Sequence, residues 1–323
     1  IGIITIPTFY SDFTAKQAGD PNYRSTTRDV KQLLEELSEQ EIEGVVVDLR
    51  NNGGGSLQEA YELFGLFIPR GPVVQIQSAG GRTDVRGDRD PSISWEGPMS
   101  VLVNRLSASA SEIFAGAVQD YGRGLVIGSQ TFGKGTVQAL LPVNEGQLKL
   151  TIAKFYRISG QSTQHQGVIP DIQFPSAFDP TEIGESALDT ALPWDQIRSL
   201  RYRPIDTPQA RLAQLIDRHQ ARIATDPDFK ALLKRTERAL ELSGETGISL
   251  HLETRIQERE ANNQALLDIE NMRRESLGLE TAQSISELEA AAKEDDVSSD
   301  ASLMESARIL LDEIQINRRL AGL

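Results

Sequence analysis

The sequence has no cysteine and only three histidines among its 323 residues. The lack of cysteine excludes disulfides and thiolate metal sites, although it does not exclude an oxidising compartment. His165, His219 and His251 are scattered along the chain, belong to no apparent catalytic motif and lack metal-ligand spacing. If the protein activates a nucleophile, the simplest available pair is therefore serine with lysine.

Long hydrophobic runs are also missing, and none approaches the roughly 20 residues that span a bilayer. Residues 1–7 have neither the basic start nor the cleavage pattern of a signal peptide, and they are typical of a strand. Because the chain begins inside a strand, we expect it to be a fragment. Acidic residues outnumber basic ones by 47 to 33, mostly after residue 175. That excess argues against nucleic acid or an anionic membrane as a partner of the later part.

Over the first 175 residues, short apolar runs alternate with segments whose apolar residues recur at helical spacing. Strands are predicted at residues 1–7, 45–49, 73–77, 99–103, 125–127 and 148–158, and helices at residues 28–37, 57–67 and 113–121. A strand, a helix and a strand in succession indicate a βαβ unit with parallel strands. Residues 11–27 and 79–96 are polar, and we expect loops there, with a hairpin as the alternative for the second segment.

A connector over residues 176–208, rich in proline and aspartate, leads to a mostly helical region. Helices are predicted at residues 256–277 and 302–320, after two earlier ones. Residues 247–252 are a possible strand, and residues 287–300 form a charged linker. The length allows about two domains.

Three consecutive glycines, Gly53, Gly54 and Gly55, follow a predicted strand and precede a predicted helix. Glycine lets the backbone approach a ligand closely and leaves amides pointing outward. The segment is therefore either an anion or oxyanion site or a plain tight turn, and the pattern alone leaves both open.

Three serines, Ser107, Ser109 and Ser111, immediately precede an amphipathic helix. One of them can serve as the N-cap, which is a common role for serine. Another can be a nucleophile whose oxyanion is stabilised by the free amides and dipole of the helix. Glu112 fits first-turn electrostatics, and that position alone assigns it no catalytic role.

Lys134 lies between Gly133 and Gly135, just before an apolar run. A surface lysine is the common alternative, but these neighbours indicate enclosure, and burial would lower the lysine pKa towards that of a working base. Gln138 would stand about 13 Å from Lys134 in a fully extended strand. Contact between them requires the chain to turn at Gly135.

Five segments resemble the tail-specific, or C-terminal processing, proteases. They are residues 48–55 (DLRNNGGG), 107–114 (SASASEIF), 119–123 (QDYGR), 131–138 (TFGKGTVQ) and 167–171 (GVIPD). A looser match at residues 191–195 (ALPWD), followed by an acidic helical region, is similar to the bacterial periplasmic subgroup often called Prc. The resemblance implies an α/β fold with a crotonase/ClpP-like serine protease core over residues 1–178. A mainly α-helical C-terminal domain would follow over residues 179–323.

The resemblance also implies a serine endopeptidase with named site residues. Ser109 would be the nucleophile, Lys134 the general base and Gln138 the residue that orients the lysine. The backbone amide of Ala110 and one from Gly54 or Gly55 would form the oxyanion hole. Asp120 matches an acidic position that the family needs, and we predict that an ion pair with Arg123 holds the active-site helix.

By the same resemblance, substrates would be flexible proteins with apolar C-termini, bound as an added strand. It implies a periplasmic location, free or peripheral at the inner membrane, an adaptor lipoprotein as a possible partner, and neither cofactor nor metal. The family's N-terminal helical and PDZ domains precede the equivalent of Ile1 and are not in this sequence, which leaves the activity of this chain open. Two alternatives remain: a catalytically silent peptide-binding fragment, and a non-hydrolytic crotonase-like acyl-thioester enzyme.

Overall fold

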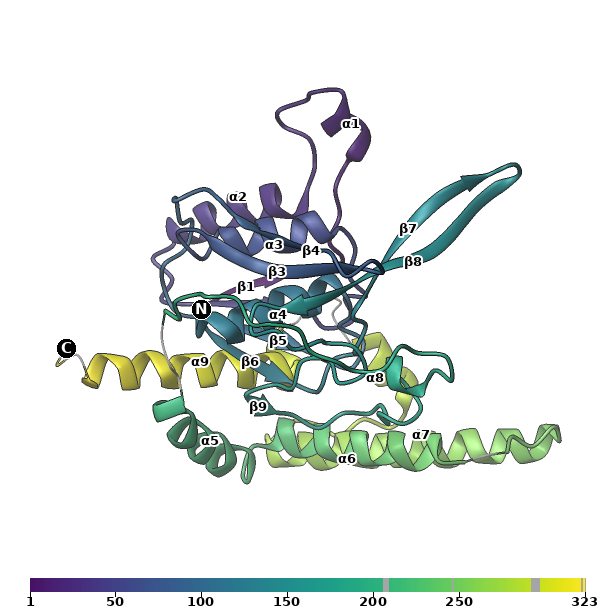
Figure 1. The fold of residues 1–323 in the computed structure, drawn as a ribbon. Coiled ribbons are helices and arrows are strands. Elements are labelled where there is room, and N and C mark those ends of the chain that lie inside the picture. The colour runs from purple at the N-terminus through teal and green to yellow at the C-terminus, as the bar shows by residue number, and fades with distance from the viewer. Residues whose placement is uncertain (206–208, 246, 292–296, 321, 323) are drawn as a thin grey trace.

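A five-stranded parallel sheet forms the centre of the computed structural model, which describes residues 1–205, 209–245, 247–291, 297–320 and 322. Its strand order is β1-β2-β5-β6-β9 (Figure 1). The strands are β1 (Gly2–Thr5), β2 (Val45–Asp48), β5 (Met99–Val103), β6 (Leu125–Gly128) and β9 (Ile172–Gln173). Every neighbouring pair is parallel, as the succession of strand, helix and strand predicted.

Helices cover both faces of this sheet. Alternate side chains of β2 point to opposite faces, with Val45 and Val47 in one apolar cluster and Val46 in the other. The first face packs against α2 (Thr26–Ser38), α3 (Leu57–Gly65) and α4 (Ala110–Tyr121). The second face packs against α5 (Gln209–Ile223), α6 (Pro227–Ser243) and α9 (Ala301–Leu320). Burial on both faces explains why these strands are continuous apolar runs.

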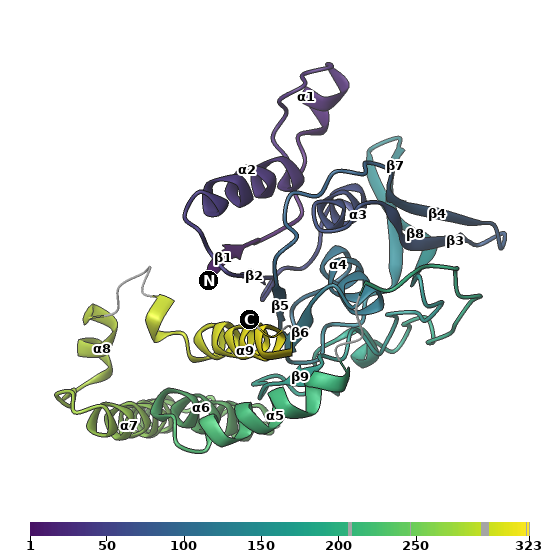
Figure 2. The ribbon, with the colours of Figure 1, turned by 90° about the vertical axis from the view of Figure 1, so that its left-hand side faces the viewer.

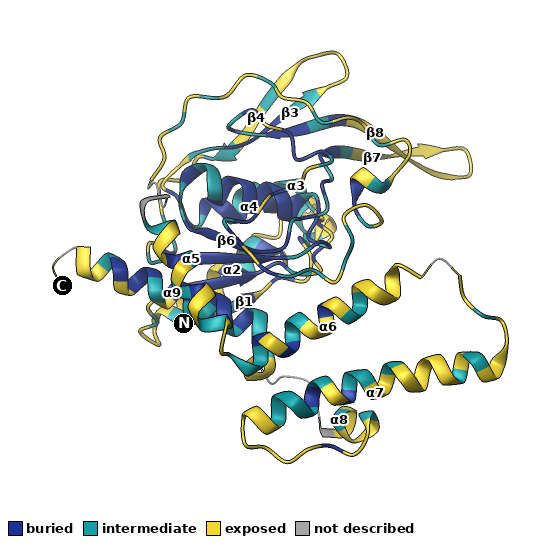
Figure 3. Ribbon diagram, turned by 90° about the horizontal axis from the view of Figure 1, so that it is seen from below, coloured by how far each residue is buried: buried dark blue, intermediate teal, exposed yellow. Residues whose placement is uncertain are grey.

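A second, antiparallel sheet has the order β4-β3-β8-β7. It consists of β3 (Gly71–Ser78), β4 (Thr83–Asp88), β7 (Thr136–Val143) and β8 (Gly146–Arg157). Helices α3 and α4 lie between the two sheets (Figure 2). The far end of the β7–β8 hairpin projects from the body and is exposed (Figure 3). Residues 79–96 thus take the hairpin alternative through β4.

Several helices have an N-cap residue whose side chain accepts a hydrogen bond from a backbone amide of the first turn. The Ser25 hydroxyl accepts from an amide at the start of α2, and the Ser56 hydroxyl does the same for α3. Asp226 caps α6, with proline at the first helical position. Helix α4 ends at Tyr121 and is capped by Gly122, whose φ of 59° is the left-handed conformation that favours glycine.

The later part of the chain contains a long helical pair. Helices α6 and α7 (Leu252–Ser276) lie side by side and extend away from the sheet, and α9 returns beneath it (Figures 1 and 3). The helices predicted at residues 256–277 and 302–320 are confirmed to within a few residues.

The strand predicted at residues 247–252 is wrong. Residues 247–251 are in no strand, and α7 begins at Leu252. The alternating side chains of Ile248, Leu250 and Leu252 are 73%, 99% and 67% exposed. A strand without a partner and without a covered face is not stable in water.

Two polar segments contain more helix than expected. A short helix, α1 (Phe13–Gln17), lies within the predicted loop at residues 11–27 and is capped by Asp12. Within the predicted linker at residues 287–300, α8 (Ile285–Ala291) extends to residue 291 and a 3-10 turn occupies Val297–Ser299. Residues 292–296 of that linker, and residues 206–208 of the predicted connector, lie outside the described residues.

Candidate active site

Ser109 stands at the point where β5 leads into α4. It is the N-cap residue of α4 and has φ 58° and ψ −110°. A positive φ is costly for a residue with a side chain, by about 1–3 kcal/mol, and it persists only where the surroundings impose it. The turn therefore holds this serine in one orientation at the positive end of a helix dipole.

Of the three serines in this segment, Ser109 is the one that lines a cavity. Ser107 and Ser111 are fully buried, and their hydroxyls donate to the carbonyls of Leu49 (2.8 Å) and Asn52 (2.9 Å). Ser109 instead faces a cavity of about 340 Å³ that Lys134 also lines. The packing thus separates one candidate nucleophile from two structural serines.

Glu112 connects the start of α4 with the lysine segment. Its fully buried carboxylate accepts hydrogen bonds from the amides of Ser109 (2.7 Å), Gly133 (2.7 Å) and Lys134 (2.9 Å), and from the Thr131 hydroxyl (2.6 Å). Burial raises the pKa of Glu112 to about 7, although all four donors favour the ionised form. Its place in the sequence indicates only favourable electrostatics in the first helical turn. The Ser-x-x-Glu spacing of a capping box was the signal that could have identified it.

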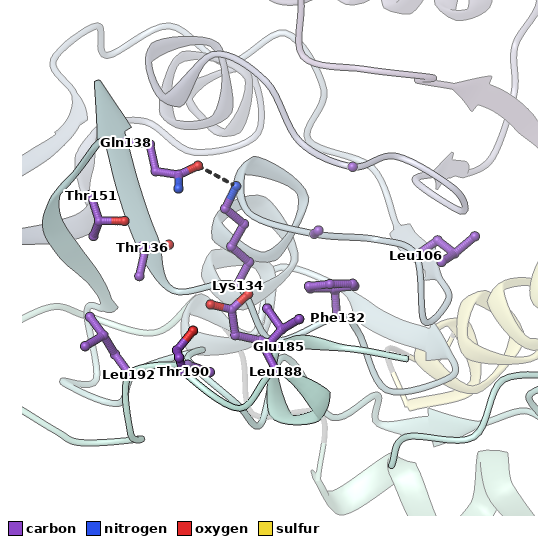
Figure 4. Close-up of a pocket in the computed structure, with 13 residues that line it drawn as sticks. Leu106, Phe132, Lys134, Thr136, Gln138, Thr151, Glu185, Leu188, Thr190 and Leu192 are labelled. Carbon is purple, nitrogen blue, oxygen red and sulfur yellow. Dashed lines mark hydrogen bonds between the residues drawn. The ribbon is translucent and has the colours of Figure 1, made fainter. Parts of the chain in front are cut away.

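Lys134 lies just before β7, and its amine donates to the Gln138 side-chain carbonyl at 3.3 Å (Figure 4). The two side chains therefore meet, and the register of β7 against β8 shifts between Val137 and Gln138, so this segment is not a regular extended strand. Lys134 is half-buried and Gln138 is exposed, so the enclosure is less complete than expected. Within the described ranges, no hydrogen bond joins the lysine amine to Ser109.

The glycine loop packs directly against the serine turn. A Cβ on Gly54 would lie 2.8 Å from the Ser109 Cβ and 3.1 Å from the Ala110 nitrogen, at a φ of +104°. The Gly54 amide donates to the Asn52 side chain at 2.9 Å, so it is occupied. The amides of Gly55 and Ala110 have no partner in the part of the chain that the structure describes. Of the two alternatives for the oxyanion hole, this geometry favours Gly55 with Ala110.

Asn52 is a site residue that the sequence analysis missed. It is fully buried, and its side chain donates to the Ile6 carbonyl (2.8 Å) while accepting from Gly54. Its own carbonyl accepts from the Ala108 amide (2.9 Å) and from Ser111. Asn52 therefore fixes the glycine loop to the segment that carries Ser109. Nothing in the local sequence distinguishes it from Asn51, because these partners are far apart along the chain.

The predicted ion pair between Asp120 and Arg123 is wrong. Asp120 pairs with Arg157 of β8 at 2.6 Å, and its side chain is 5% exposed. Arg123 donates to the carbonyls of Phe67, Trp95 and Gly97, and its burial lowers its pKa to about 10. Asp120 and Arg123 are three residues apart near the end of α4, and this spacing suggested the pair. In the fold, β8 of the antiparallel sheet instead brings the Arg157 guanidinium to Asp120.

A second cavity, of about 680 Å³, adjoins the first and is also lined by Lys134, Thr136 and Gln138. Much of its remaining lining comes from the segment after residue 178 (Figure 4). Among the described residues, no group of three or more histidine, aspartate or glutamate side chains could hold a metal ion. No described helix is long and apolar enough to cross a membrane.

This combination defines an α/β protein with a serine at a helix N-terminus, a lysine across a cavity and a glycine loop that leaves amides free. Residues 1–174 match the family model described as peptidase family S41, and residues 178–315 match the C-terminal domain of tail specific protease. The chain belongs to peptidase family S41. It has a mixed α/β core followed by a helical C-terminal region, as expected.

Curated relatives agree with this assignment. The chain is 40% identical over 329 residues to the tail-specific protease of Haemophilus influenzae, covering 98% of this chain and 45% of that protein. It is 41% identical over 145 residues to the carboxy-terminal-processing protease of Bartonella bacilliformis, covering 44% of this chain and 33% of that protein. The chain therefore spans less than half the length of these relatives.

Among solved structures, the photosystem II D1 C-terminal processing protease is 36% identical to the chain. The match covers 55% of this chain and 42% of that one, with a TM-score of 0.45.

Proposed function

We propose that this chain is the catalytic part of a C-terminal-processing serine endopeptidase in which Ser109 is the nucleophile and Lys134 the general base. The observation that carries the proposal is the cavity that Ser109, alone among three neighbouring serines, shares with Lys134. Membership of a peptidase family supports the class of reaction.

In the proposed reaction, unprotonated Lys134 takes the proton of the Ser109 hydroxyl, and the Ser109 oxygen attacks the substrate's peptide carbonyl. The amides of Ala110 and Gly55 hold the oxyanion. As the carbon–nitrogen bond breaks, Lys134 returns the proton to the leaving amine, and an acyl-enzyme ester remains. Lys134 then takes a proton from water, which attacks the ester, and Ser109 regains its proton.

This chemistry requires the lysine amine within hydrogen-bond reach of the Ser109 hydroxyl. In the structure the amine donates to Gln138 instead. Rotation about the flexible lysine side chain can move the amine across the cavity, and catalytic hydrogen bonds often tighten only when substrate is bound. We therefore assign Gln138 the role of holding Lys134 in the resting enzyme and orienting it during the reaction.

Substrates are proposed to be proteins with flexible, apolar C-termini that bind as an extended strand. Strand β7 lies at the edge of its sheet, and its residues Thr136 and Gln138 line both cavities. An edge strand offers unpaired backbone groups to a peptide. A periplasmic location and an adaptor lipoprotein partner are further proposals, supported by the resemblance to the periplasmic subgroup and by the tail-specific relative.

Labelling with a serine-reactive fluorophosphonate tests this proposal. The parent chain is expected to take up one adduct, which peptide mass spectrometry locates on Ser109. Ser109→Ala should abolish the label, and Lys134→Ala should slow labelling by two or more orders of magnitude, the scale of a lost general base. An adduct on another residue, or equal labelling of Ser109→Ala, would contradict the assignment.

A catalytically silent peptide-binding fragment is the second candidate, and the hydrogen bond between Lys134 and Gln138 favours it. That candidate predicts peptide binding without any serine adduct. The acyl-thioester alternative needs a carboxylate that can act on substrate. Glu112 is the carboxylate beside Ser109, and its two oxygens already accept four hydrogen bonds from the protein.

A further inference from the structure

The cavity of about 680 Å³ beside the candidate dyad is lined partly by apolar and partly by polar side chains. Its apolar walls are built by the side chains of Leu106, Phe132, Leu188 and Leu192, and one edge is formed by β7 and β8 (Figure 4). Lys134 and Gln138 line this cavity and also the one that holds Ser109. A peptide at Ser109 would therefore have this space next to its scissile bond.

One carboxylate, that of Glu185, is among the residues that line this cavity. Glu185 is 9% exposed and stands in a 3-10 turn, Glu185–Ala187. Its backbone amide donates to the Phe132 carbonyl (2.9 Å), and its side chain accepts from Gln164 (3.0 Å). The side-chain oxygen of Gln164 in turn accepts from the Gly135 amide (2.9 Å). Glu185 is thus fixed against the lysine segment.

The side-chain partner of the Glu185 carboxylate is the neutral amide of Gln164, not a cation. Glu185 forms no ion pair with any residue that the structure describes. Lys134 is the cation that shares the cavity, but its amine is directed to Gln138 (Figure 4). A mostly buried carboxylate without a cationic partner favours a cation that arrives from outside.

We infer that this cavity receives the side chain of a substrate residue that flanks the scissile bond, and that Glu185 sets its specificity. The inference rests on the proposed function. Aliphatic side chains fit the leucine and phenylalanine walls. Lysine and arginine fit as well, because their apolar stems lie along those walls while their charged ends meet Glu185. Aspartate and glutamate are excluded by charge repulsion and by loss of hydration.

The cavity residues that we propose to determine specificity come from the later part of the chain. Glu185, Leu188 and Leu192 all follow residue 178, within the segment that matches the C-terminal domain of tail specific protease. The proposed nucleophile and base lie in the segment that matches peptidase family S41. The two matched segments therefore meet at this pocket.

Digestion of an unfolded protein, with cleavage sites quantified by mass spectrometry, tests the inference on the 323-residue chain. In the parent we expect cuts flanked by aliphatic, lysine or arginine residues, and few flanked by aspartate or glutamate. Glu185→Gln keeps an oxygen for Gln164 but removes the charge. It should lower the ratio of lysine- and arginine-flanked to leucine-flanked cuts roughly fivefold, the scale of one partly exposed ion pair.

Glu182→Gln is the matched control, because Glu182 lies on the same segment but is exposed and does not line the cavity. It should leave the ratio as in the parent. Glu185→Lys should reverse the preference, gaining cuts beside aspartate and glutamate. An unchanged ratio in Glu185→Gln would overturn the inference while leaving the proposed function intact. A parent that makes no cuts would overturn both.

Discussion

At the scale of single residues, Glu112 has the most unusual environment in the site. Burial raises its pKa from 4.5 to about 7. Because the folded protein then binds this proton more tightly than the unfolded chain, the proton stabilises the fold most at and below about pH 4.5. That contribution is lost as the pH rises through 7, and amounts to at most about 3 kcal/mol.

We therefore predict a pH-dependent difference between the parent and Glu112→Gln, which cannot titrate at this position. The free energy of unfolding of the parent, relative to that of the variant, should fall steadily between about pH 4.5 and pH 7. Urea unfolding at several pH values measures this difference, and other carboxylates cancel in the comparison. A difference that stays constant, or rises with pH, would show that the four donors outweigh burial.

Asp120 provides a second residue-scale prediction. Its pairing with Arg157 joins α4 to β8, and the two side chains are 5% and 16% exposed. Asp120→Ala should lower the free energy of unfolding by about 3 kcal/mol, because it leaves a largely buried guanidinium without its carboxylate. Asp84→Ala breaks an exposed pair with Arg82 and should cost less than about 0.5 kcal/mol. Equal losses in the two variants would refute the structural role of Asp120.

The sequence supported the identity of the site residues better than their contacts. Ser109 and Lys134 stand in motifs long enough to carry a family resemblance, and the structure places both on one cavity. The partners of Asp120 and Asn52 come from elements far away in the chain. No spacing rule applies to such contacts, because they depend on how the two sheets enclose α4.

At the scale of elements, the glycine loop is shaped by what it touches. Gly54 has no room for a side chain beside Ser109. Gly54→Ala should reduce the proposed peptidase activity by about 100-fold or more, the cost of displacing the proposed oxyanion loop. In Gly53→Ala the added methyl has nothing within 4 Å, and its loss should be much smaller. Steady-state cleavage of a reporter peptide compares the two, and similar losses would contradict the packing argument.

Strands and helices were predicted correctly where burial imposes a clear pattern of apolar residues on the sequence. The β2, β5 and β6 runs are apolar because both faces of their sheet are covered, and all three were predicted as strands. The alternation at residues 247–252 had no such cause, since these side chains lie in solvent. An alternating apolar pattern therefore predicts a strand correctly only where a second element packs against the apolar face.

At the scale of the whole molecule, the helical C-terminal region also completes the core. Helix α9 packs its buried side chains under β2 and β5 of the parallel sheet. Sequence periodicity predicted this helix and its apolar face, but not what that face would cover. A domain boundary after residue 178 stays a prediction, and this packing argues that the two parts stabilise each other.

Leu310→Ala tests that coupling. Leu310 is fully buried in α9 among residues of the parallel sheet. Its truncation should lower the free energy of unfolding by about 3 kcal/mol and destabilise the whole sheet in a single transition. Leu320, which is 73% exposed near the end of the same helix, is the control and should change little on truncation to alanine. Loss of the helical signal alone, with the sheet intact, would indicate independent folding units.

The proposed joint action of Ser109 and Lys134 on a polypeptide can be measured in one assay. An unfolded reporter with an apolar tail is incubated with the parent, Ser109→Ala and Lys134→Ala. A copy of the reporter with a charged tail serves as the control. We expect the parent to cleave the apolar-tailed reporter, and neither variant to cleave it measurably. Cleavage by Lys134→Ala at the parent's rate would contradict the dyad.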